Sequence, residues 1–140
     1  MSTISGELRS RIFKADSHRC CYCQTSEANS GIPLTFDHIH PRSKGGATVF
    51  ENLCLACRPC NEYKSDAIEG LDPVTGSVVA LFHARQEIWN DHFTWSSDGT
   101  RVEGITPIGR ATVIALRMNH GVIVAARSRW VSSGWHPPQD

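Results

Sequence analysis

Residues 36–64 read FDHIHPRSKGGATVFENLCLACRPCNEYK and hold the most informative spacing in the chain. Together with the preceding Leu34 and Thr35, the stretch opens with a short run typical of a strand, which Pro41 ends. Paired glycines and polar residues then indicate a loop, and a short helix is expected from about Arg58. A strand, a loop and a helix thus follow one another, and this part of the chain predicts a small α+β unit.

Two pairs of cysteines flank the strand and the loop. Each pair has two residues between its cysteines, and such a knuckle places two thiolates on one side of an ion. Two knuckles can therefore close a tetrahedral Zn²⁺ site, which would stabilise a core too small to fold well alone. The 33 residues between the pairs, 24–56, exceed the usual zinc-finger gap, so a whole structural unit is expected to loop out between the knuckles. The expected ligands are Cys20, Cys23, Cys57 and Cys60.

Two further cysteines lie close to these pairs. We interpret Cys54, within the apolar stretch NLCLAC, as a core residue and Cys21 as a partly exposed residue that binds no metal. A rival pairing, in which Cys54 and Cys57 are ligands and Cys60 is free, stays open at this point. A further alternative is that the cysteines are reduced and pack as small hydrophobic residues.

The composition limits the classes of protein to which the chain can belong. The chain has 140 residues, 40% of them hydrophobic, and no net charge, which is typical of one globular domain and not of a disordered chain. Its longest apolar runs are too short to span a bilayer, and its first residues do not resemble a signal peptide, so we expect a cytoplasmic protein. Residues 1–64 carry eight Lys and Arg against six Asp and Glu. This small excess fits a polyanionic partner only if the contact is local or a second protein assists.

Further elements are expected on both sides of this unit. Residues 5–20 predict a helix with Ser5 as its N-cap. The sequence GLDPVTGS marks a turn, and we expect it to separate a core with an N-terminal helix, residues 1–70, from an extension, residues 71–140. The extension is expected to contain a hairpin and two helices and to pack on the core.

The order CCYC, DHIHPRSKGG, ENL and ACRPCNEYK resembles the HNH endonuclease family over roughly residues 8–66. The resemblance implies a ββα-metal fold, in which a hairpin and a helix surround one catalytic divalent ion, and cysteine knuckles that hold structural zinc. The second half is similar to a tail found on a subset of bacterial HNH proteins, and that similarity implies no catalytic role.

The resemblance also implies a role for four residues. Asp37 would bind the catalytic metal and His38 would be the general base that takes a proton from the attacking water. Asn52 would hold the loop between the hairpin strands, and Asn61 would be the second metal ligand. This assignment suits the chemistry, because imidazole titrates near neutral pH and oxygen ligands favour Mg²⁺ or Mn²⁺. Asp37 and His38 point to opposite faces of a strand, so we expect a distortion at the strand end.

DNA, or RNA as an alternative, is the expected substrate. The side chains expected to contact phosphate are Lys64, His40, Arg42, Lys44 and Arg58, although His40 is equally compatible with plain solvent exposure. A homodimer or a partner that supplies specificity is also compatible with the sequence. The main rival hypothesis is a non-enzymatic zinc module that binds nucleic acid or protein.

Overall fold

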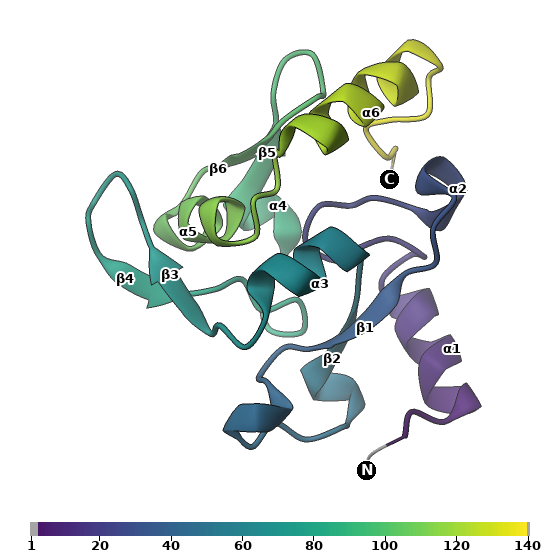
Figure 1. Cartoon of the computed structure of the whole chain (residues 1–140), viewed down its shortest axis with the longest axis vertical. Coiled ribbons are helices and arrows are strands. Elements are labelled where there is room, and N and C mark those ends of the chain that lie inside the picture. The colour runs from purple at the N-terminus through teal and green to yellow at the C-terminus, as the bar shows by residue number, and fades with distance from the viewer. Residues whose placement is uncertain (1–2, 140) are drawn as a thin grey trace.

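The computed structural model describes residues 3–139 and confirms the α+β class (Figure 1). Its strands form three separate two-stranded antiparallel sheets, β1–β2, β3–β4 and β5–β6. Within the described residues, no helix combines the length and the apolar character needed to cross a membrane. In chain order the elements are α1 (Gly6–Ala15), α2 (Glu27–Ser30), β1 (Thr35–His38), the 3₁₀ turns η1 (Arg42–Lys44) and η2 (Phe50–Asn52), β2 (Leu53–Ala56), α3 (Arg58–Lys64), β3 (Glu69–Leu71), β4 (Val78–Ala80), α4 (Trp89–His92), β5 (Phe93–Trp95), β6 (Val102–Gly104), α5 (Pro107–Ala115) and α6 (Gly121–Ser132).

The first helix begins where its cap was expected. The Ser5 hydroxyl accepts a hydrogen bond from the Leu8 amide at 3.2 Å, which satisfies one of the free donors of the first turn. Ile12 is fully buried and anchors α1 in the core, while its charged residues face outward. The cap and the apolar spacing together account for this helix.

The hairpin β1–β2 and the helix α3 form the unit that was expected between the cysteine pairs. Asp37 lies opposite Cys54 and His38 opposite Leu53 in the hairpin register. Every residue of β2 is buried, so β2 is the inner strand, whereas β1 is only partly covered. The helix α3 packs against β1 and begins directly after β2 at the second cysteine pair (Figure 1).

The second half begins with a hairpin whose turn was expected from the sequence but whose first strand was not. The turn with Pro73 and Gly76 joins β3 to β4, and the expected division after residue 70 falls inside β3; that division stays a prediction. The helices α5 and α6 and the hairpin β5–β6 occur where the sequence placed two helices and a hairpin. Gly104 lets β6 approach α5, because a Cβ at this residue would lie 2.3 Å from the Arg110 backbone nitrogen.

Polar contacts hold the two halves together. The Arg85 guanidinium donates two hydrogen bonds to the Asp16 carboxylate, at 2.7 and 3.1 Å. The same carboxylate accepts the Leu55 amide of β2 at 2.8 Å. The Trp89 indole donates to the Tyr22 carbonyl at 2.7 Å, next to the first cysteine pair. The extension therefore contacts both α1 and the segment that carries the metal ligands.

Candidate metal centre and active site

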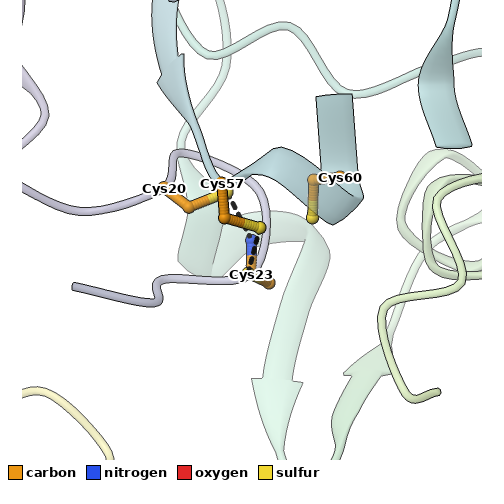
Figure 2. Close-up of side chains that lie close together, drawn as sticks. All are labelled: Cys20, Cys23, Cys57 and Cys60. Atoms are coloured by element: carbon orange, nitrogen blue, oxygen red, sulfur yellow. Dashed lines mark hydrogen bonds between the residues drawn. The ribbon is translucent and has the colours of Figure 1, made fainter. Parts of the chain in front are cut away.

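The four cysteines expected to bind zinc converge on one point (Figure 2). Their sulfur atoms all lie within 4.8 Å of one another, and the Cys23 and Cys57 sulfurs are 3.5 Å apart. Zinc bonds of about 2.3 Å in a tetrahedron would place sulfurs about 3.8 Å apart, so the cluster is close to the size that a zinc ion requires. The arrangement suits a structural site, because all four ligands come from the protein.

The rival pairing is wrong, since Cys60 belongs to this group and Cys54 does not. Hydrogen bonds from the thiols of Cys20, Cys57 and Cys60 lower the pKa of Cys23, whereas burial raises the pKa of Cys20 and contacts with the other three thiols raise that of Cys60. Cys57 is the N-cap of α3 and Cys60 lies in its first turn. Metal binding at these residues would therefore fix the start of α3 against the first cysteine pair.

The two remaining cysteines lie together inside the core. Cys54 is fully buried, as expected, but Cys21 is only 6% exposed, so its predicted partial exposure is wrong. The two sulfurs are 2.7 Å apart, and the Cys21 amide donates a hydrogen bond to the Leu55 carbonyl of β2 at 2.9 Å. Neither cysteine takes part in the metal group.

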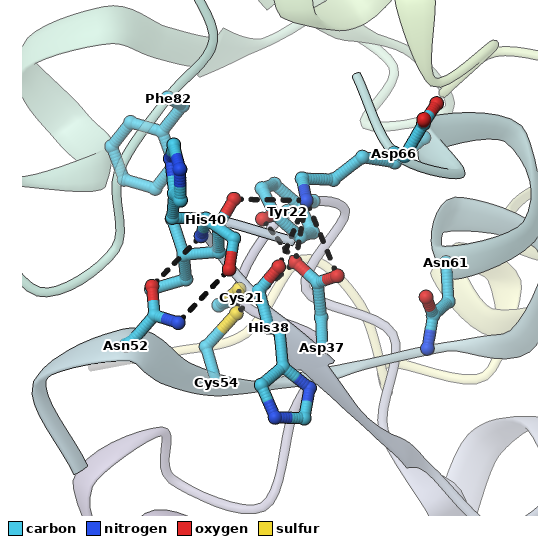
Figure 3. A network of polar contacts seen from close by, with 12 residues as sticks. Cys21, Tyr22, Asp37, His38, His40, Asn52, Cys54, Asn61, Asp66 and Phe82 are labelled. Atoms are coloured by element: carbon cyan, nitrogen blue, oxygen red, sulfur yellow. Dashed lines mark hydrogen bonds and ion pairs between the residues drawn. The ribbon is translucent and has the colours of Figure 1, made fainter. Parts of the chain in front are cut away.

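Asp37 lies in a buried network on the face of β1 that α3 covers (Figure 3). Its carboxylate accepts a hydrogen bond from the Tyr22 hydroxyl at 2.7 Å and forms an ion pair with the Lys64 ammonium at 3.2 Å. Burial raises the pKa of Asp37, and the Lys64 charge opposes this effect. The ionised form of the buried Asp37 carboxylate is therefore stabilised by a positive charge beside it.

Lys64 differs from its expected role as a phosphate contact. Its side chain is 1% exposed, and its ammonium donates to the carbonyls of His38 and Ile39 at 3.2 and 3.1 Å in addition to pairing with Asp37. A buried ammonium with these partners does not face a substrate, and the reason is its position on the inner side of α3. The predicted contact between Lys64 and phosphate is therefore corrected.

Asn61 lies one helical turn before Lys64 and faces the same strand. Its amide nitrogen donates to the Thr35 hydroxyl at 2.9 Å, while its amide oxygen has no hydrogen-bond partner among residues 3–139. Thr35 and Asp37 alternate along β1 and so lie on one face of it. The Asp37 carboxylate and the Asn61 amide oxygen thus come from adjoining elements, β1 and α3, and each is the kind of oxygen donor that a divalent ion prefers.

His38 points away from Asp37, on the other face of β1 (Figure 3). The register of β1 with β2 is regular from Thr35 to His38, so β1 does not have the distortion that was expected to bring both side chains together. Its Nε2 lies 2.9 Å from the Thr48 hydroxyl, a contact that sequence spacing did not reveal. Burial and, next, the Arg42 charge lower the pKa of His38, so its ring is neutral at neutral pH. The ring is therefore held in one orientation and has a nitrogen available to accept a proton.

The loop between the hairpin strands is braced from within. The Asn52 amide accepts a hydrogen bond from the His40 backbone nitrogen at 2.8 Å and donates to the carbonyls of His40 and Ala47 at 3.0 and 2.8 Å. These are the contacts of a residue that fixes loop shape. The His40 side chain is exposed and its ring contacts the Lys44 carbonyl at 3.0 Å.

The two basic residues of η1 have different surroundings. Arg42 is exposed and close enough to His38 to influence its pKa. Lys44 pairs with Asp66, just beyond α3, at 3.5 Å, and also donates to the Asp66 carbonyl. Arg42 is therefore the freer of the two cations beside His38.

A hairpin and a helix joined to a four-cysteine centre define a ββα unit with a structural metal site. Residues 20–67 match the family model of the HNH endonuclease, and the chain therefore contains an HNH domain there. This match confirms the resemblance seen in the sequence. Comparison with curated proteins gave no match. Comparison with solved structures gave none either.

Proposed function

We propose that the protein is a metal-dependent endonuclease that hydrolyses phosphodiester bonds in DNA in the cytoplasm. His38 is the general base in this proposal, and Asp37 and Asn61 hold the catalytic divalent ion. Because the His38 and Asp37 side chains lie on opposite faces of β1, the proposal requires the end of β1 to turn so that both reach one phosphate. The observation that carries the proposal is the oriented, neutral imidazole of His38 on the hairpin of an HNH domain. A module that only binds nucleic acid has no need of such a base.

The base acts through the ring nitrogen that Thr48 does not contact. When Nε2 donates its proton to the Thr48 hydroxyl, Nδ1 carries the lone pair and accepts a proton from the attacking water. The low pKa of His38 keeps this lone pair available at neutral pH. Proton transfer to a positioned imidazole contributes about 10²- to 10⁴-fold to the rate of such reactions.

The carboxylate of Asp37 and the amide oxygen of Asn61 fit Mg²⁺ or Mn²⁺, because both are oxygen donors on adjoining elements and the amide oxygen has no other partner within residues 3–139. When bound, such an ion neutralises phosphate charge and stabilises the leaving oxygen. Asp37 would then exchange part of its contact with Lys64 for the ion. Zinc at the cysteines serves as scaffold and has no part in the reaction.

Substrate contact next to His38 falls to Arg42, with His40 and Lys44 at the same loop. Arg42 is exposed. A cationic side chain of this kind positions the phosphate backbone without reading the base sequence. Lys44 would have to release Asp66 before it could contact phosphate. A chain with one such site cuts one strand, so double-strand cleavage would require two copies of the chain.

Plasmid nicking tests the proposal. Supercoiled plasmid should be nicked by the zinc-loaded protein with Mg²⁺ or Mn²⁺, and EDTA should stop the reaction. His38→Ala should lower the nicking rate by about 10²-fold or more. His18→Ala is the matched control, since His18 is an exposed histidine in the turn after α1.

Zinc content and thermal unfolding of both variants show whether the fold is intact. Equal nicking by His38→Ala and the wild type would refute the assignment of the base. Plasmid binding without nicking in any divalent ion would favour the rival, a zinc-dependent binding module.

A further inference from the structure

A groove lies beside the metal centre, lined in part by Cys23, Cys57 and Cys60, and neither the family match nor the proposed reaction accounts for it. Its volume is about 390 Å³, and its walls come from α3, the segment around α2, and α6 with the residues before it. Apolar side chains form much of its floor, among them Pro59 and Ile123. Such a mixture of apolar floor and a few polar groups is typical of a binding surface.

The charge of the groove has a single sign. Four arginines line it, and no Asp or Glu does so among the described residues. The whole chain, by contrast, has equal numbers of acidic and basic residues. A zinc ion with four thiolates would carry two negative charges, so the four arginines still leave the groove with an excess of two positive charges. Its occupant is therefore expected to be an anion.

The arginines divide into one structural and three exposed residues. Arg127 is fully buried and donates to the carbonyls of Thr100 and Met118, which fixes α6 beside the metal centre. Arg58, Arg117 and Arg129 are exposed at the rim. Arg117 is also held in place, since its guanidinium lies 5.1 Å from the centre of the Tyr63 ring.

Arg58 connects the groove to the proposed active site. Arg58 and Asn61 are three residues apart on α3 and are therefore neighbours on the helix surface. A strand whose phosphate lies at Asn61 thus meets Arg58 next and the groove after it. Phosphates along a strand match the charged rim, and the faces of unpaired bases match the apolar floor, whereas a duplex keeps its base faces covered.

We infer that this groove binds a single strand of DNA that continues from the cleaved phosphodiester. The inference rests on the proposed function for the point at which the strand enters. It adds a substrate class, DNA with an unpaired segment next to the cut, and it gives the C-terminal extension a role in holding that segment.

The test measures binding of a fluorescein-labelled 20-nucleotide DNA by anisotropy, in the His38→Ala background, against a duplex of the same sequence. Arg117→Glu combined with Arg129→Glu should weaken single-strand binding about tenfold or more. The slope of log K against log salt should fall by about 1.4, because each contact to single-stranded DNA contributes about 0.7. Val122→Glu, at a residue 79% exposed at the groove, should weaken binding without a folding defect.

Arg101→Glu is the control for each single substitution, Arg117→Glu or Arg129→Glu, since it makes the same charge change as one of them at an exposed residue outside the groove. Unchanged single-strand binding in the double variant would overturn the inference, and so would an equal loss for the duplex. Wild-type protein that binds DNA through the groove but nicks nothing would refute the nuclease and leave the groove standing. Normal nicking by the wild type, together with groove variants that bind single-stranded DNA as well as the wild type does, would support the nuclease and refute the role of the groove.

Discussion

Replacing Lys64 by methionine tests the buried pair at the centre of the HNH domain. Lys64 and Asp37 are 1% and 4% exposed, so neither charge is solvated by water. Methionine keeps most of the length and apolar character of the lysine stem but removes the ammonium. In the Lys64→Met variant, the Asp37 carboxylate would keep two side-chain donors within residues 3–139, the Tyr22 hydroxyl at 2.7 Å and the more distant Cys54 thiol at 4.0 Å.

The expected loss of stability follows from the contacts of the ammonium. Removing one member of a buried ion pair costs about 3–5 kcal/mol, because the other charge is left without compensation. Two backbone carbonyls, of His38 and Ile39, lose a donor as well. We therefore expect Lys64→Met to lower the free energy of unfolding by about 3–5 kcal/mol. Adding Asp37→Asn removes the stranded charge and should restore part of this loss.

Urea unfolding of the zinc-loaded protein, followed by tryptophan fluorescence, gives these free energies. Lys44→Met is the matched control, because Lys44 pairs with Asp66 at the surface, where the side chains are 40% and 65% exposed. An exposed pair of this kind contributes at most about 1 kcal/mol.

A loss in Lys64→Met no larger than in Lys44→Met would refute the reasoning, since it would mean that the Lys64 ammonium reaches water. A double variant as unstable as the sum of the two single variants would also count against a direct pair between Lys64 and Asp37.

Three further predictions concern zinc, pH and orientation. Cys57→Ser should lose zinc and unfold at lower temperature, while Cys21→Ser keeps one zinc per chain by elemental analysis. Arg42→Ala should move the acidic limb of the nicking rate to higher pH, because the Arg42 charge lowers the pKa of His38 and nicking requires the neutral ring; an unmoved limb in the pH–rate profile would contradict this. Thr48→Val should slow nicking about tenfold by freeing the His38 ring, and Thr48→Ser should restore the rate, as single-turnover nicking would measure.

Local sequence signals predicted the elements that depend on neighbours in the chain. Ser5 caps α1 because its hydroxyl reaches the amide three residues ahead, a contact between near neighbours in the chain. The four metal ligands were also predictable, because two-residue spacing within each cysteine pair limits how the sulfurs can point.

Features that depend on distant segments were not predictable from spacing. Lys64 looked like an exposed cation because lysine is rarely buried, and only the packing of α3 on β1 brings Asp37 to it. Thr48 lies in a loop, and its contact with His38 exists because the hairpin folds the loop back. The strand β3 has no alternating pattern of its own, and its pairing with β4 decides its conformation.

The first two turns of α3 carry Cys60, Asn61 and Lys64, which contact the metal group, Thr35 and Asp37 in turn. Each residue of a helix is rotated by about 100° from the one before it. A single inserted residue between Cys60 and Asn61 would therefore turn both later side chains away from β1 while the sulfurs stayed in place. The rotation of α3 about its axis is thus fixed by Cys57 and Cys60. We therefore expect the segment from Cys57 to Lys64 to tolerate substitutions at residues that face away from β1 but no insertion or deletion.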